Sequence, residues 1–180
     1  MATVPTTHTV AVGDKVTASD ENTYTRDPNV FWLAVPRVHA YASAAQTLTT
    51  ATSTLITFDS EQYDSDTMHS TASNTGRLTA ITAGMYAFNA KITYASNATS
   101  WRYIMVRKNA AGSAGGGTLI SQDFITGLAV SNNSIWVNFD ISLAANDYLE
   151  VFGSQNSGGN LNTVAGAFIT YAQMRWVASS

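Results

Sequence analysis

The chain has 180 residues, a net charge of −3 and no cysteine, and only 12% of its residues are charged. This length fits one domain of roughly 100–200 residues, or one domain with a short appendage. Without cysteine the chain can form neither a disulfide framework nor a thiolate metal site. Its nine basic residues are scattered, so no positive stripe is available to bind nucleic acid.

The N-terminal stretch MATVPTTHTVAVGDK lacks the charged segment followed by an apolar segment that marks a signal peptide. No run approaches the ~18 apolar residues that a membrane-spanning helix needs. We therefore expect a protein that is made in the cytoplasm without a signal peptide and is not inserted into a membrane.

Residues 1–36 are expected to form an N-terminal arm. Thr17 and Asp20 occupy the positions of a capping box, which predicts a helix over residues 18–26 that ends before Pro28. Helices shorter than about 12 residues are marginal in water, so this one must pack on something. An apolar cluster follows it: Val30, Phe31, Trp32, Leu33 and Val35. The arm either packs beneath its own domain or attaches to a larger assembly.

Residues 37–180 are expected to form one all-β domain. Apolar segments separated by turn residues predict strands at 37–43, 54–58, 77–82, 85–95, 101–108, 118–125, 134–143, 147–154 and 166–177. After Gly84 the side chains alternate strictly, as in a half-buried strand. One face carries Tyr86, Phe88, Ala90, Ile92 and Tyr94. This pattern indicates a β-sandwich.

The last predicted strand, 166–177, differs because it carries bulky residues on both faces. Phe168, Met174 and Trp176 oppose Ile169, Tyr171 and Val177. A two-layer sandwich buries only one face of each sheet, so a second apolar face needs a loop or a neighbouring subunit to cover it. This pattern favours self-association.

The order of these segments resembles a known family. Gly84-Met85-Tyr86-Ala87-Phe88, Asn146-Asp147 before Tyr148-Leu149-Glu150-Val151, and Gly166-Ala167-Phe168-Ile169 are similar to segments of the globular-head domain of the first complement component and its tumour-necrosis-factor-like relatives. FDSEQYDSDTMHSTASNTGRLTA and SQNSGGNLN resemble a bacterial and phage version of that domain. The resemblance implies a jelly roll that works as a homotrimer. We expect Tyr86, Tyr94, Phe168 and Tyr171 near the subunit contact.

The segment GDKVTASDENTYTRDPNVFWLAVPR resembles the opening of many phage virion proteins. This second resemblance implies an arm that seats the head on a particle. The residues expected to dock are Thr17, Asp20, Tyr24, Arg26, Phe31, Trp32 and Leu33. No collagen-like Gly-x-y stalk precedes the head, so the role of a stalked immune lectin is not supported.

An acidic group, Asp59, Glu61, Asp64 and Asp66, offers carboxylate oxygens that a calcium ion could use. It lacks the glycine and the final glutamate of a calcium loop. A structural or solvated loop is the competing interpretation, and Arg77 could then pair with Glu61 or Asp59. No cofactor other than calcium is suggested.

Catalytic signals are absent from the sequence. The three histidines are far apart in the chain, and the glycine-rich run 110–117 lacks the Lys-Ser/Thr ending of a phosphate loop. We expect no enzyme. The main hypothesis is a bacteriophage virion protein, a trimeric jelly roll displayed as capsid decoration, head fibre or tail-fibre tip that aids host attachment. Its partners would be other virion proteins, such as capsid or tail, and a host glycan. The alternative is a soluble lectin-like module that binds sugar through loops such as 97–100 and 154–162.

Overall fold

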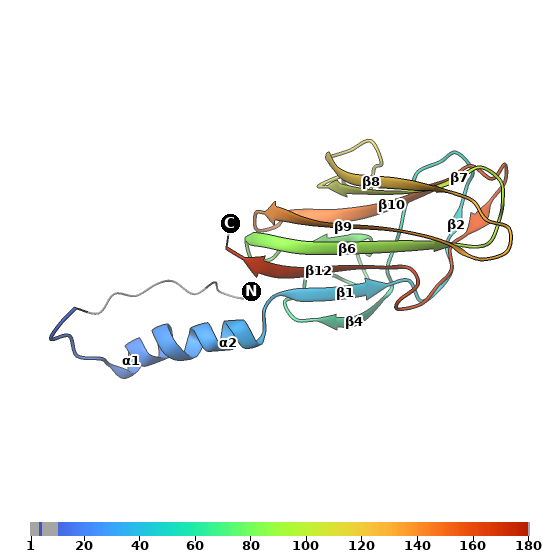
Figure 1. The fold of residues 1–180 in the computed structure, drawn as a ribbon. Coiled ribbons are helices and arrows are strands. Elements are labelled where there is room, and N and C mark those ends of the chain that lie inside the picture. Colours follow the sequence, from blue (N-terminus) through green and yellow to red (C-terminus); the bar gives the residue numbers. More distant parts are fainter. Residues whose placement is uncertain (1–3, 5–10, 180) are drawn as a thin grey trace.

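The computed structural model of the chain describes residue 4 and residues 11–179, except for the side chains of Asp27 and Leu33. A helical arm leads into two packed β-sheets (Figure 1). The arm contains α1 (Ala18–Glu21), a π-helical segment (Asn22–Arg26) and α2 (Asp27–Leu33). The strands are β1 (Arg37–Tyr41), β2 (Thr47–Leu48), β3 (Thr54–Leu55), β4 (Ser60–Asp64), β5 (Arg77–Thr79), β6 (Gly84–Tyr94), β7 (Trp101–Lys108), β8 (Thr118–Thr126), β9 (Asn133–Leu143), β10 (Tyr148–Gln155), β11 (Leu161–Asn162) and β12 (Tyr171–Ala178).

The two main sheets are built from strands that are not neighbours in sequence. The first sheet has the order β4-β1-β12-β6-β9, and the second has the order β3-β10-β7-β8 with β5 also paired to β10. The paired strands are antiparallel, and the chain crosses repeatedly from one sheet to the other. This topology is a jelly-roll sandwich, so the predicted fold class is confirmed.

The core lies between the sheets. Tyr86, Phe88, Ile92 and Tyr94 of β6 point into it, as the alternation predicts, and the opposite residues of β6 are mostly half-buried. The β9 positions Ile135, Val137, Phe139, Ile141 and Leu143 share the core face, with Phe139 and Ile141 only partly buried. Trp136, on the outward face of β9, is 56% exposed.

Gly84 begins β6 where no larger residue would fit. Its φ is +155°, and an added Cβ would collide with the indole of Trp176 and lie 2.6 Å from the carbonyl oxygen of Ala178. This close approach lets the Trp176 indole donate a 3.1 Å hydrogen bond to the carbonyl of Ala83. Trp176 is therefore buried beside the start of β6, at the end of the sandwich where the arm attaches.

The helical arm extends further than the sequence predicted. Thr17 and Asp20 form the expected capping box, with the Asp20 N–H donating to the Thr17 hydroxyl at 3.2 Å. Pro28 does not end the helix, because it lies in the first turn of α2. The π-helical segment immediately before it widens the backbone where proline would clash with an α-helical carbonyl. None of the described helices is long and apolar enough to cross a membrane.

The start of the last predicted strand was wrong, and three short strands were not predicted. Residues 166–169 form a turn rather than part of the last strand, so Phe168 and Ile169 do not belong to β12. Within β12 the core side carries Ala172, Met174 and Trp176, while the outward side includes the polar residues Gln173 and Arg175. The acidic stretch expected to be a loop contains β4, an edge strand paired with β1. The two-residue strands β2 and β11 were not predicted either.

Candidate functional site

The outward face of the first sheet carries an aromatic cluster at the β4-β1-β12 edge. We call His39, Tyr63, Phe168 and Tyr171 the aromatic cluster. His39 stacks on Tyr171 with ring centroids 4.9 Å apart, and it meets Phe168 edge-on at 5.4 Å and Tyr63 at 5.9 Å. The guanidinium of Arg37 lies over the Tyr63 ring at 5.3 Å. These side chains come from three strands and the 166–169 turn.

His39 is almost fully buried beneath its aromatic neighbours and is held on both ring nitrogens. Nε2 lies 2.6 Å from the carbonyl oxygen of Ala167, and Nδ1 lies 3.2 Å from Oε1 of Gln173. A carbonyl oxygen only accepts, so Nε2 carries a proton and donates it. Burial raises the pKa of the Tyr171 hydroxyl beside it. The histidine thus fastens the turn that carries Phe168 to the sheet.

Phe168 and Tyr63 remain open to solvent despite this packing. Phe168 is 69% exposed and Tyr63 is 44% exposed. Tyr63 also borders a shallow hollow of about 500 Å³ that crosses β6, β9 and β12. Its polar lining includes Asn89, Asn138, Asp140, Gln173 and Arg175. The face therefore combines exposed rings with hydrogen-bonding groups, the composition of a wet protein contact.

The four residues expected at a subunit contact divide into two pairs. Phe168 and Tyr171 lie on the outward face just described. Tyr86 and Tyr94 are fully buried inside the sandwich, where their hydroxyls donate to the carbonyls of Thr82 at 2.5 Å and Tyr103 at 2.7 Å. Burial raises the pKa of both hydroxyls. These two side chains present no surface to a neighbouring subunit, so we correct their assignment to core. The alternation did not distinguish a ring in the core from a ring at a contact.

The acidic group is distributed among separate partners. Asp59 accepts hydrogen bonds from the backbone and hydroxyl of Ser43. Burial opposes their effect, but the hydrogen bonds, led by those from Ser43, hold the pKa of Asp59 below its ordinary value. Glu61 pairs with His69 at 2.7 Å. Arg77 pairs with neither expected carboxylate; it donates to Glu150 at 2.9 Å.

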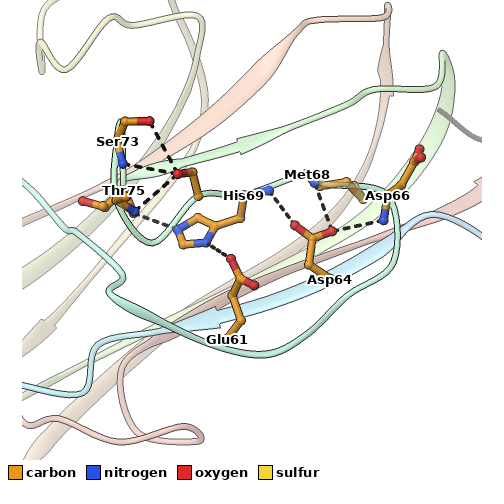
Figure 2. Close-up of polar contacts among 9 residues, drawn as sticks. Glu61, Asp64, Asp66, Met68, His69, Ser73 and Thr75 are labelled. Atoms are coloured by element: carbon orange, nitrogen blue, oxygen red, sulfur yellow. Dashed lines mark hydrogen bonds and ion pairs between the residues drawn. The ribbon is translucent and has the colours of Figure 1, made fainter.

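Figure 2 shows how Asp64 organises the loop after β4. Its carboxylate accepts the backbone N–H groups of Asp66 at 3.1 Å, Met68 at 3.0 Å and His69 at 2.9 Å. His69 is buried, with Nδ1 facing Glu61 and Nε2 lying 3.1 Å from the carbonyl oxygen of Thr75. The side chains therefore close a loop onto the sheet edge.

The calcium interpretation loses its geometric basis. Within residue 4 and residues 11–179, no three or more Asp, Glu, His or Cys side chains come together in a way that could hold a metal ion. Both carboxylate oxygens of Asp64 accept hydrogen bonds from backbone N–H groups, and Glu61 faces His69. Asp66 is buried near the hydroxyl of Thr82, which donates to it at 3.2 Å. In the described structure these carboxylates pair with Ser43, His69, Thr82 and backbone N–H groups.

The arm contacts the sandwich through one residue in particular. Phe31 is only 5% exposed and packs edge-on against Trp176, with ring centroids 4.9 Å apart. Trp32 also approaches Trp176, at 5.8 Å, but is 59% exposed. Tyr24 and Arg26 lie on the exposed part of the arm, as do the capping residues. The side chain of Leu33, also expected to dock, lies outside the described residues.

No model of a known protein family matches the sequence, and no curated protein matches it. Solved structures do match the fold. Eiger TNF from S. frugiperda superposes with a TM-score of 0.61 and 13% identity, covering 82% of this chain and 95% of that one. A structure of murine APRIL at pH 5.0 gives 0.62 and 10%, covering 79% of this chain and 99% of that one. The globular domain of zebrafish complement 1qA protein gives 0.57 and 10%, covering 81% and 99%. At these identities the likeness establishes the jelly-roll fold shared by TNF and complement globular heads.

Proposed function

We propose that the chain is a non-catalytic jelly-roll head that forms a homotrimer through the outward face of its first sheet. The observation that carries the proposal is the aromatic cluster, in which Phe168 and Tyr63 stay exposed and Tyr63 borders a hollow with hydrogen-bonding groups. Soluble monomers rarely leave contiguous apolar patches larger than a few hundred Å² uncovered. A trimer is also what the resemblance to complement-type heads implies.

A subunit contact on this face has physical advantages. A stable obligate interface buries about 2,000 Å² or more and is rich in aromatic residues. The adjacent strand β4 is a sheet edge, and packing a neighbour against it protects unpaired backbone groups from foreign chains. Trp136, on β9, extends the exposed aromatic surface across the same face.

We further propose that the head is displayed on a bacteriophage particle, as capsid decoration, head fibre or tail-fibre tip, and that it aids attachment to the host surface. The arm supports this role, because Phe31 fixes its base to the sandwich while the rest of the helix projects from it (Figure 1). The segment GDKVTASDENTYTRDPNVFWLAVPR adds the resemblance to virion proteins. The partners would be capsid or tail proteins and a host glycan. The alternative of a lectin-like module is favoured by a second hollow, which Trp101, Tyr103 and Phe124 line on the second sheet.

Sedimentation velocity of Phe168→Asp tests the trimer. A carboxylate placed at this contact would be desolvated without a partner, so the variant is expected to sediment as a monomer at micromolar concentration while the native chain sediments as a trimer. Phe168 is mostly exposed in the single chain, so the variant should still fold.

Phe124→Asp is the matched control, because Phe124 is equally exposed, at 68%, on the second sheet. It should leave the trimer intact. A native chain that sediments as a monomer, or a Phe168→Asp variant that remains trimeric, would refute the proposed contact.

A further inference from the structure

The outward face of the second sheet has an aromatic hollow of its own. We call it the Trp101 hollow; it measures about 430 Å³ and is lined by Ala51, Ser53, Trp101, Tyr103, Phe124 and Ser154. Trp101 and Tyr103 both belong to β7, and their rings meet edge-on with centroids 6.2 Å apart. Phe124 of β8 lies directly opposite Tyr103 in the strand register.

One ring of this hollow is held in place by its neighbours. Tyr103 packs against a small cluster of Met105, Phe152 and Ala110 that is separate from the main core. The Tyr103 hydroxyl donates to the side-chain oxygen of Gln122. Packing thus holds the Tyr103 ring and a hydrogen bond holds its hydroxyl, while Phe124 stays 68% exposed. The Tyr103 ring is therefore fixed before any ligand arrives, which lowers the entropic cost of binding.

One polar side chain reaches the hollow from a residue that is otherwise buried. Ser154 is only 4% exposed, and it is one of the lining residues. A serine hydroxyl can both donate and accept hydrogen bonds. A hydroxyl-bearing ligand in the hollow would therefore find a hydrogen-bonding group at Ser154.

The lining also excludes several ligand classes. None of the six lining residues is charged, so the hollow offers no cation for a phosphate or sulfate and no carboxylate for a metal or an amine. Its volume of about 430 Å³ lies within the ~300–1,000 Å³ range of small-ligand pockets. What remains is a small, neutral, amphipathic ligand.

We propose that the Trp101 hollow binds a neutral oligosaccharide. A pyranose ring has an apolar C–H face that packs on Trp101, Tyr103 and Phe124, and it has hydroxyls at its edge that pair with Ser154 and Ser53. The combination of apolar walls and a few placed polar groups is the usual design of a small-ligand site. The inference names the ligand class for the attachment role proposed above and rests on that role for its biological setting.

Isothermal titration tests the site on the full chain with three neutral probes: tetrasaccharides of β-1,4-linked glucose, β-1,4-linked N-acetylglucosamine and α-linked mannose. At least one should bind and shift the tryptophan fluorescence. Phe124→Ala and Trp101→Ala should each weaken binding about tenfold or more, because each removes a stacking face. Ser154→Ala should weaken it several-fold. A sulfated tetrasaccharide should bind no better than its neutral counterpart.

Leu119→Ala is the control, because it removes an exposed apolar side chain from the same strand as Phe124 but outside the lining of the hollow, and it should leave sugar affinity unchanged. Phe124 is exposed, so its variant should fold even if Trp101→Ala does not. The site is refuted if no neutral probe binds at millimolar concentration, or if binding survives Phe124→Ala, or if Phe124→Ala alters the sedimentation of the native assembly. Sedimentation of the same samples reports the trimer separately: sugar binding by a monomer contradicts only the trimer, and a trimer without sugar binding contradicts only this site.

Discussion

Asp147 shows how single polar residues set the turns of this sandwich. It lies in the turn between β9 and β10, where Asn146 adopts a positive φ of 73°. Its carboxylate accepts hydrogen bonds from the side chain of Asn109 at 2.7 Å, the N–H of Ala144 at 3.0 Å and Lys108 at 3.2 Å. The bond from Asn109, followed by those from Ala144 and Lys108, holds the pKa of Asp147 below its ordinary value despite partial burial.

Asp147→Asn is expected to lower the free energy of unfolding by about 1–2 kcal/mol at neutral pH, because it loses a charge-assisted hydrogen bond. A carboxyl whose folded pKa is depressed stabilises the fold above its unfolded pKa, and this contribution is lost as the pH falls through the folded value. The difference in free energy of unfolding between the native chain and the variant should therefore disappear as the pH drops below about 4. Denaturant titrations at several pH values measure this difference.

Asp123→Asn provides the comparison, since Asp123 is an exposed residue of β8 whose only described side-chain bond is to the neighbouring N–H of Phe124. It should have little effect at any pH. An Asp147→Asn deficit that stays constant down to acid pH would show that the ionised carboxylate does not supply the stability.

At the scale of elements, the arm and the sandwich meet through two adjacent aromatic residues with different roles. Phe31 is buried against Trp176, whereas Trp32 touches the same indole but remains mostly exposed. Trp176 is itself fixed by the hydrogen bond to Ala83 and by the close approach of Gly84. The end of the helix therefore continues the core of the sandwich, and the helix beyond it does not.

Phe31→Ala should lower the free energy of unfolding by about 2–4 kcal/mol, because it opens a cavity against Trp176. Trp32→Ala, the neighbouring change, should cost less than about 1 kcal/mol, as is usual at exposed positions. Thermal and denaturant unfolding of both variants measures the difference. Equal effects would mean that the arm is not anchored through Phe31.

The sequence predicted the long strands and missed the short ones, for physical reasons. β6 and β9 have one face in the core, and this imposes a period of two on their residues. β2 and β11 contain only two residues each and can show no period. β4 reads SEQYD and has no apolar face, since it is an edge strand. The helix was predicted to end before Pro28, but it continues because a π-helical segment accommodates the proline.

The candidate site was less predictable than the fold. Phe168 and Tyr171 were expected on it, but Tyr63, His39 and Trp136 were not. His39 meets Tyr63 and Phe168 only because β1 pairs with β4 and the 166–169 turn folds back over the sheet. Such contacts depend on strand order, and the alternation of residues within one strand does not predict which strands are neighbours.

For the whole molecule, the question is what the projecting arm attaches to. Deletion of residues 1–26 keeps Phe31 and removes only the partly buried Val4 from the packing against the core, so the head should fold and remain trimeric with a small change in unfolding temperature. The truncated protein should nevertheless be absent from purified particles, because the exposed part of the arm is gone. Mass spectrometry of particles carrying the native or the truncated chain tests this. Incorporation of the truncated chain, or absence of the native chain, would contradict the particle role.

The long strand β6 runs from the end of the head near the arm to the opposite end (Figure 1). It starts at Gly84, beside the base of the arm, and ends at Tyr94, shortly before Trp101 begins β7. Eleven residues at about 3.4 Å each separate the two ends by about 35 Å. A head tethered by its arm would therefore hold the Trp101 hollow at its far pole, with the sandwich acting as a rigid spacer. In a trimer, three such poles would point the same way, and three weak sugar contacts would reinforce one another on a glycan-coated surface.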